Sequence, residues 1–312
     1  PNVVVVLHNG SPVELPWADR VSAILEMYLG GQGVGEACDW LLYGEANPSG
    51  RLAETFPYRL EDNPSYLHFP GNGKRVLYGE DIFVGYRYYD TKKVPVRYAF
   101  GHGLSYTEFT YGDLTLSSAQ MTDEDILTVS FKVKNTGKTE GKEVVQLYVA
   151  DLCGISERPV KELKGFAKVH LLPGEEKTVS MEISARDLSY YEERLGDWYA
   201  PSGTYRILIG HASDDVRLHA DIIFETQKEL PLCVDFTTTF GELLDHTKTA
   251  PVITELLAPL AAAAASAEGM SDEYKKLGEQ VIREMPLKFL LGQMPGEQVE
   301  QLIGQLNCLL AQ

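Results

Sequence analysis

The pattern of apolar and polar residues divides this chain into three regions. Near the start, residues 3–7 form a continuous β-branched run (VVVVL), which is typical of a parallel strand covered on both faces. A second apolar run covers residues 21–29. A glycine-rich turn and apolar residues at helical spacing follow over residues 29–44. Strand, turn and helix in this order predict a layered α/β domain.

The glycine-rich turn raises the question of a dinucleotide site. Gly30, Gly31, Gly33 and Gly35 do not fit the spacing GxGxxG, and no acidic residue closes a second strand about twenty residues further on. Close packing of a helix against a strand is the better explanation of these glycines.

After Tyr111, apolar residues recur at every second position instead of at helical spacing. About seven short strands, separated by turn signals such as Pro173-Gly174-Glu175, predict an antiparallel β-sandwich of immunoglobulin-like or fibronectin-like type over residues 111–226. One face of each strand is apolar and the other is polar, so the apolar face is expected in the core. The residues that we predict to be buried are Leu127, Val129, Phe131, Val145, Leu147, Met181, Ile207 and Ile222.

Residues 227–312 return to helical spacing, and we expect a helical extension there. Its first apolar row is Ile253, Leu256, Leu257 and Leu260. Each such side chain contributes roughly 1.5–3 kcal/mol when fully buried, so we expect the row to dock on the body of the protein or on a partner chain. The expected fold is therefore α/β plus all-β with domains 1–110, 111–226 and 227–312.

An aromatic stretch, YGEDIFVGYRYYD (78–90), precedes the sandwich. Five of its first twelve residues are aromatic, which favours a packed joint between two domains over a flexible linker. Tyr78, Glu80, Asp81 and Arg87 are candidate substrate-binding residues, because sugar clefts combine aromatic faces with charged groups that bind hydroxyls. The alternative is a structural seam in which a carboxylate satisfies Arg87.

Charge and composition exclude several classes of partner. The net charge of −17 provides no basic stripe for nucleic acid or for an anionic membrane surface. No apolar run approaches the length of a membrane span. The seven histidines show no metal-ligand spacing, and we expect neither a metal nor a cofactor. Four widely separated cysteines without a CxxC pair favour a reducing, cytoplasmic location.

Several motifs in one order resemble the C-terminal half of glycoside hydrolase family 3, β-glucosidase type. They are GGQGVGEACDWLLYGEANPSGRLAETFP (30–57), YGEDIFVGYRYYD (78–90), FGHGLSYTEFTY (100–111), EVVQLYV (143–149), RPVKELKGFAKVHLLPGE (158–175) and GTYRILIG (203–210). The tail, with EMPLKFLLG (284–292), is similar to a helical extension found in many bacterial members. The resemblance implies the end of an α/β sandwich domain, a fibronectin type III-like domain and a role in carbohydrate metabolism.

The resemblance assigns no catalytic residue to this chain. In that family the nucleophilic Asp belongs to an N-terminal barrel, and the acid/base Glu lies in a loop upstream of the strand that matches residues 3–7. Retaining hydrolysis needs two carboxyl groups about 5–5.5 Å apart on opposite sides of the glycosidic bond. Glu80 and Asp81 are sequence neighbours, and on a strand they would point to opposite faces, so we do not assign them this role.

We therefore expect a C-terminal fragment of a retaining β-glucosidase-like exo-glycosidase that is inactive by itself. Its partners would be the missing barrel domain and a β-glucoside or related oligosaccharide. Two alternatives stay open, a stand-alone carbohydrate-binding module and a scaffold that mediates oligomerisation. The sequence also leaves open whether the chain forms a homo-oligomer.

Overall fold

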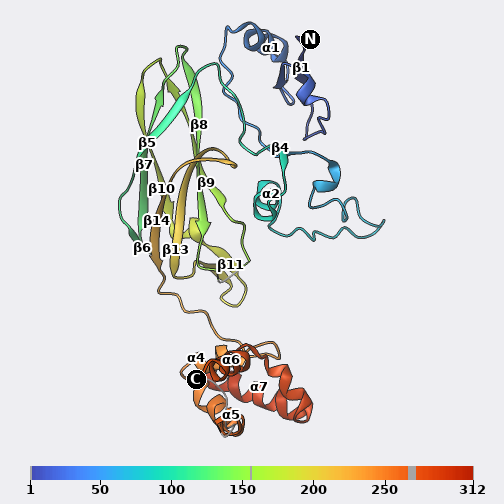
Figure 1. Cartoon of the computed structure of the whole chain (residues 1–312), viewed down its shortest axis with the longest axis vertical. Coiled ribbons are helices and arrows are strands. Elements are labelled where there is room, and N and C mark those ends of the chain that lie inside the picture. The colour runs from blue at the N-terminus through green and yellow to red at the C-terminus, as the bar shows by residue number, and fades with distance from the viewer. Residues whose placement is uncertain (1, 155–156, 266–271, 312) are drawn as a thin grey trace. The chain divides into compact units, whose positions relative to one another are not determined.

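A computed structural model of the chain describes residues 2–154, 157–265 and 272–311 (Figure 1). It divides into two compact units. The first comprises Pro1–Tyr191 and Trp198–Lys228, and the second comprises Glu192–Asp197 and Glu229–Gln312. The first unit contains an α/β segment and a β-sandwich, and the second unit is mainly helical.

The α/β segment begins with two parallel strands. Strand β1 (Val4–Leu7) pairs with β2 (Ala23–Glu26). The helix that follows, α1, ends at Tyr43, because the next residue, Gly44, has the left-handed conformation. The remaining elements of the segment are η1 (Ala18–Arg20), α1 (Val34–Tyr43), β3 (Phe56–Pro57), η2 (Leu60–Asp62), α2 (Tyr86–Lys92) and β4 (Val96–Tyr98). β3 pairs with β4 in an antiparallel ladder.

The prediction of a strand covered on both faces is wrong for β1 within this chain. Val4 is 50% exposed, and no residue of α1 is buried. The buried core of the segment is small and consists of Leu15, Ala18 and Phe56. Parallel strands and their helices bury apolar runs only when further layers cover them.

The sandwich is formed by two sheets whose strands are antiparallel, except for the parallel pair of β6 with β14. One sheet has the strand order β10-β7-β5, and the other has the order β6-β14-β13-β8-β9. Their bounds are β5 (Phe109–Leu116), β6 (Gln120–Thr122), β7 (Ile126–Asn135), β8 (Gly141–Asp151), β9 (Glu162–Leu171), β10 (Glu176–Ser184), β13 (Gly203–Ala212) and β14 (Asp215–Glu225). A short helix α3 (Ala185–Leu188) and a hairpin of β11 (Tyr190–Glu192) and β12 (Asp197–Tyr199) lie between β10 and β13 in the sequence.

The predicted register of the sandwich is confirmed for every core position but one. Leu127, Val129, Phe131 and the other predicted residues are at most 2% exposed, with the exception of Met181. Met181 is only partly buried, although its neighbours on the same face of β10, Val179 and Ile183, are buried. Its sulfur lies 3.3 Å from the position that a Cβ atom of Gly165 would occupy. The methionine therefore lies at the rim of the core and not in its centre.

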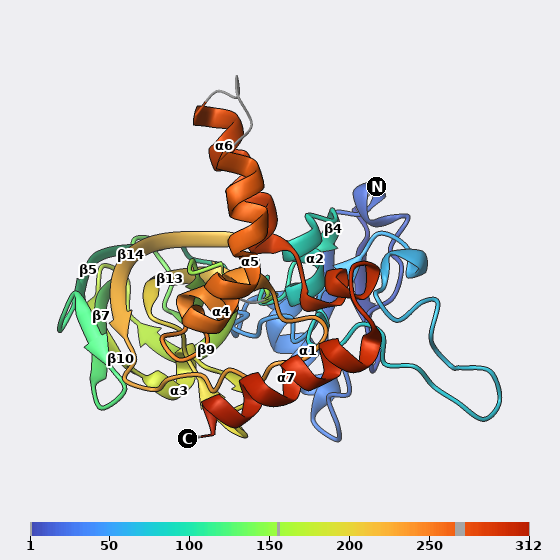
Figure 2. The same ribbon diagram turned by 90° about the horizontal axis from the view of Figure 1, so that it is seen from below.

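The helical unit, whose helices are orange and red in Figure 2, has its own core of buried residues. Its elements are α4 (Phe240–Asp245), α5 (Ala250–Ala265), α6 (Asp272–Glu284), η3 (Leu287–Gly292) and α7 (Gly296–Leu310). Ile253 is fully buried, and Leu256 and Leu257 pack against the same core. The apolar row of α5 therefore docks on the tail's own helices, which corrects the expected docking on the body or on a partner. Leu260 lies outside the described side chains.

Among the helices of the described ranges, none has both the length and the apolar character that a membrane span requires.

Candidate functional site

The aromatic stretch places helix α2 against strand β9 of the sandwich (Figure 1). The Tyr86 hydroxyl accepts a hydrogen bond of 2.7 Å from the Leu163 backbone N–H. The Tyr86 ring stacks on Phe100 at 4.8 Å and meets Tyr148 edge-on at 5.9 Å. Asp90 at the end of the helix forms an ion pair of 2.7 Å with Lys161. The stretch is thus a packed seam between the α/β segment and the sandwich.

The four candidate substrate-binding residues lie in two different environments. Tyr78 is 79% exposed, and Asp81 is exposed in a turn with φ +49°. Glu80 is partly buried, and its Oε2 atom is buried without a hydrogen-bond partner. Arg87 pairs with Glu162 on the sandwich at 3.4 Å. Arg87 therefore has the carboxylate partner that the structural alternative requires, whereas Tyr78, Glu80 and Asp81 lie in the turns before α2.

A cluster of charges surrounds Glu162. Arg158 donates to Glu162 at 2.7 Å and forms a second ion pair of 3.3 Å with Asp151, and Lys164 lies 3.6 Å from Glu162. Burial works to raise the pKa of Glu162, but the positive charges of Lys164 and Arg158 hold it below its ordinary value. Each carboxylate in this cluster is neutralised by a cation, so the cluster stabilises the seam and has no free acid or base.

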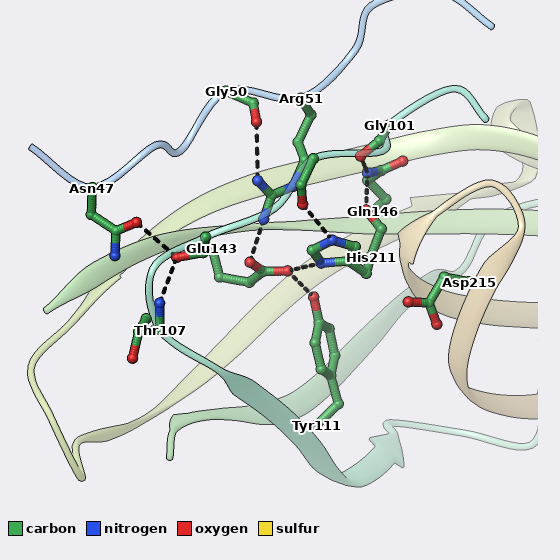
Figure 3. A network of polar contacts seen from close by, with 12 residues as sticks. Asn47, Gly50, Arg51, Gly101, Thr107, Tyr111, Glu143, Gln146, His211 and Asp215 are labelled. Atoms are coloured by element: carbon green, nitrogen blue, oxygen red, sulfur yellow. Dashed lines mark hydrogen bonds and ion pairs between the residues drawn. The ribbon is translucent and has the colours of Figure 1, made fainter. Parts of the chain in front are cut away.

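A second polar network lies deeper in the seam, and the sequence had not indicated it (Figure 3). Its centre is Glu143 on β8, which is 0% exposed. Its carboxylate accepts hydrogen bonds from Arg51 Nη2 at 2.5 Å and from the Tyr111 hydroxyl at 2.7 Å, and it contacts His211 Nδ1 at 2.5 Å. Arg51 comes from the α/β segment and the other three residues from the sandwich. The network therefore joins the two parts through one buried carboxylate.

The electrostatics of this network favour the ionised carboxylate. Burial works to raise the pKa of Glu143, but the hydrogen bond with His211 and the charge of Arg51 bring it below its ordinary value. Burial and the adjacent carboxylate raise the pKa of the Tyr111 hydroxyl. Tyr111 is therefore neutral and donates its proton to Glu143.

Smaller polar contacts complete the seam. Asn47 accepts hydrogen bonds from the Ser105 hydroxyl at 2.9 Å and from the Tyr106 N–H at 2.8 Å. Gln146 donates to the His211 carbonyl oxygen at 2.6 Å. A Cβ atom on Gly101, which has φ +83°, would lie 2.5 Å from the Gln146 side chain. Only glycine therefore allows the chain to pass this close to the sandwich.

One sequence signal could have revealed the Glu143 network. Glu143 lies in phase with Val145, Leu147 and Val149, the inward-facing positions of β8. A charged residue at a position that the period assigns to the core needs a buried partner. That partner, Arg51, is 92 residues away in the sequence, and no local pattern identifies it.

Neither network provides the chemistry of glycoside hydrolysis. A retaining glycosidase requires two carboxyl groups about 5–5.5 Å apart on either side of an accessible bond. Glu143 is fully buried and paired, and Glu162 is surrounded by cations. In the part of the chain that the structure describes, no group of three or more His, Cys, Asp or Glu side chains could hold a metal ion.

The fold and the seam together define a class of protein, in which the end of an α/β domain is fastened to a fibronectin type III-like sandwich. Residues 1–106 match the glycosyl hydrolase family 3 C-terminal domain. Residues 143–213 match the fibronectin type III-like domain. The chain belongs to glycoside hydrolase family 3, whose C-terminal part it resembles.

The similar proteins and solved structures are longer than this chain, which matches only part of each. Thermostable beta-glucosidase B of Acetivibrio thermocellus is 44% identical over 310 residues, which are 98% of this chain and 41% of the relative. The beta-glucosidase of Kluyveromyces marxianus is 46% identical over 74% of this chain and 27% of its own length. The crystal structure of that enzyme with glucose has a TM-score of 0.67 at 43% identity and covers 71% of this chain and 26% of its own.

A Bifidobacterium adolescentis GH3 beta-glucosidase is also similar in structure. Its TM-score is 0.72 at 38% identity, and the match covers 80% of this chain and 37% of the solved chain. This chain therefore spans about two fifths, or less, of the length of the relatives that it matches. The match with the Acetivibrio thermocellus protein includes the helical unit, because it covers nearly the whole chain.

Proposed function

We propose that this chain is the C-terminal part of a bacterial retaining β-glucosidase-like exo-glycosidase that cleaves β-glucosides or related oligosaccharides. The observation that carries this proposal is the 44% identity over 98% of the chain to a relative named as a thermostable beta-glucosidase. In the complete enzyme the chain would shape the rim of the substrate cleft. It would also hold the catalytic barrel and the α/β domain together.

Exposed apolar side chains support a partner for the α/β segment. Leu29, Tyr43, Leu67 and Leu77 are all more than 60% exposed. They accompany a core of only three buried residues, so the segment buries little of its apolar surface by itself. We propose that the upstream barrel and the first half of the α/β domain of a family 3 enzyme cover this surface.

Activity measurements test the proposal directly. The purified chain is incubated at high concentration with an aryl β-glucoside, alone and together with a separately expressed upstream half. We expect no hydrolysis alone and activity after mixing, because the nucleophile and the acid/base provide the chemical route. Turnover by the 312 residues alone, abolished by substituting one of their own carboxylates, would contradict the proposal.

The substrate-side residues are a separate part of the proposal. Tyr78, Glu80 and Asp81 are proposed to reach the substrate from the turns before α2. The exposure of Tyr78 and Asp81 supports this, as does the Glu80 Oε2 atom, which has no hydrogen-bond partner within the described residues. Arg87 is included as the fourth proposed contact, although it pairs with Glu162. Alanine variants of the complete enzyme should raise KM or lower kcat. An alanine variant of Phe166, which is 70% exposed on β9, is the control, and unchanged kinetics for all four variants leave only the structural role.

Location and domain boundaries are also proposed. Cys38, Cys153, Cys233 and Cys308 are free thiols, which supports a reducing, cytoplasmic location. The boundary between the second unit and the sandwich falls at residues 228–229, which supports domains 111–226 and 227–312. The first boundary, at residues 110–111, rests on the change in the spacing of apolar residues there, since both sides of it belong to the same compact unit.

A further inference from the structure

The long loop that precedes α2 has a glycine-rich tip, GNGKR, at residues 71–75. Gly71 and Gly73 have the left-handed backbone conformation, with φ values of +93° and +84°. The Asn72 N–H donates a hydrogen bond of 3.1 Å to the Arg75 carbonyl oxygen, which closes the tip into a turn. Every residue of the tip is exposed. The tip therefore presents to water an asparagine that is followed directly by a glycine.

An Asn-Gly pair carries the groups for a chemical modification that needs no enzyme. The backbone nitrogen of the glycine attacks Cγ of the asparagine side chain, so that a new C–N bond forms and the nitrogen loses its proton. The Cγ–Nδ2 bond then breaks, and ammonia leaves with that proton. Water opens the resulting cyclic imide at either of its carbonyl carbons. One opening gives aspartate, and the other gives isoaspartate, in which the main chain runs through the former side chain. Glycine favours the attack because it has no Cβ atom to crowd the nitrogen.

The chain has two such pairs, Asn9-Gly10 and Asn72-Gly73, and the structure separates them. Asn9 is partly buried after strand β1, and its Nδ2 donates a hydrogen bond of 2.8 Å to the Ser11 carbonyl oxygen. This bond holds the amide group that has to turn towards the glycine nitrogen and then leave. The Asn72 side chain is exposed and has no hydrogen-bond partner within the described residues. A Cβ atom on Gly73 would meet no other atom within 4 Å, so the tip is also open around the attacking residue.

The remaining asparagines are blocked by their neighbours in the sequence or by their hydrogen bonds. Proline follows Asn47 and Asn63, and its nitrogen carries no proton that the reaction could release. Asn135 and Asn307 each donate a hydrogen bond from Nδ2 to a backbone carbonyl oxygen. A β-branched valine follows Asn2 and crowds the attacking nitrogen. Both the sequence and the structure therefore single out position 72.

We propose that Asn72 is a site of spontaneous deamidation and isomerisation, whereas the fold protects the identical pair at Asn9. Each event replaces a neutral amide with a carboxylate beside Lys74 and Arg75, so the tip loses its net positive charge. The isoaspartate product also inserts a methylene group into the main chain of the turn. The reaction needs only this chain and water, and it is therefore independent of the activity proposed for the complete enzyme.

Peptide mapping by mass spectrometry on the folded 312-residue chain, incubated at pH 8, tests the selectivity. We expect Asn72 to deamidate about fivefold or more faster than Asn9, which is the factor that one hydrogen bond of ordinary strength supplies. In guanidinium chloride the two rates should approach each other, because both pairs contain the same reacting groups and the Asn9 bond is lost. Equal rates in the folded chain, or an unchanged ratio in the unfolded chain, would overturn the proposal.

Variants test the reacting residue itself. Labelling with an isoaspartyl methyltransferase, followed by peptide mapping, detects the isoaspartate product at the tip. The wild-type chain and N9Q should accumulate this label at the same rate. N72Q, in which the side chain is longer by one methylene group and closes the ring poorly, should lack it. Because Asn72 is exposed and its side chain holds no hydrogen bond within the described residues, N72Q should keep the fold. Labelling of the N72Q tip at the wild-type rate, or an unlabelled tip in the wild type, would show that Asn72 is not the modified residue.

Discussion

The sandwich and the α/β segment of the same unit bury their apolar residues to very different extents. In the sandwich, both sheets direct one face inward, and core residues from Met121 to Phe224 are almost completely inaccessible to solvent. In the α/β segment, the buried core cluster has only three members, Leu15, Ala18 and Phe56, and helix α1 has no buried residue. The two regions have comparable lengths, so the difference does not come from the amount of chain.

The comparison shows that the sandwich and the α/β segment are stabilised in different ways, although they belong to the same unit. A sandwich closes on itself, because each sheet covers the inner face of the other. A pair of parallel strands with one helix has no second layer, and its apolar faces need cover from elsewhere. The seam attaches the α/β segment to the sandwich, through α2 and through the buried ion pair of Arg51 with Glu143.

The largest effect is expected from a core substitution in the sandwich. Phe131→Ala removes a ring that is 0% exposed and should lower the free energy of unfolding by about 3–5 kcal/mol. Phe166→Ala is the matched control, because this ring is 70% exposed on β9, and it should change stability by about 0.5 kcal/mol or less. Urea denaturation measures both. Equal losses for the two variants would mean that sandwich packing does not dominate the unit's stability.

A seam substitution should have the next largest effect. Arg51→Met leaves the Glu143 carboxylate buried without its guanidinium and should cost about 3 kcal/mol, since His211 and Tyr111 still contact it. The double variant R51M/E143L removes both charges and should regain most of that loss, as urea denaturation would show. Arg59→Met breaks an exposed pair with Asp62 and should cause no measurable change. If the double variant were less stable than R51M, the loss in R51M would not come from the unpaired charge of the buried Glu143.

Acid should weaken the seam before it affects the sandwich core. The pKa values of Glu143 and Glu162 are lowered from 4.5 in the folded chain, so both groups contribute stability that is fully present above about pH 4.5. This contribution is lost as the pH falls through their lower folded values. Denaturation curves between pH 7 and pH 3 should show this loss. In R51M the loss should begin at a higher pH, and identical curves for variant and wild type would count against the role of Arg51.

The smallest expected effect concerns a single hydrogen bond of the joint. Tyr86→Phe removes the hydroxyl that accepts from the Leu163 N–H and should cost about 1 kcal/mol while it leaves the ring stacking intact. Tyr43→Phe, at a tyrosine that is 81% exposed, is the control and should have no effect. Hydrogen exchange of the Leu163 amide reports the change locally. Unaltered protection of this amide would show that Tyr86 contributes through packing alone.

Local sequence patterns determined most of the fold. The period of two along β7, β8, β13 and β14 identified the inward residues because a strand alternates its side chains between two faces. Met181 was assigned wrongly, since the period gives the face on which a residue lies and not how completely its neighbours cover it. The helical row of α5 was identified correctly, but the surface on which it docks was not.

The candidate site followed from the sequence only in part. The aromatic stretch indicated a joint, and Tyr86 and Asp90 do contact the sandwich. Whether Tyr78, Glu80 and Asp81 bind substrate stays a prediction, because composition identifies a type of surface and not its occupant.

The sequence by itself determined which faces are apolar, where strands and helices lie and to which family the motifs point. Only the tertiary structure decided that Glu143, Arg51 and His211 meet in one buried network. Periodicity is a property of neighbouring residues, whereas an ion pair across 92 positions depends on how two separately patterned segments pack together. The charge at position 143 required a partner, and the packing of the chain determined which residue it was.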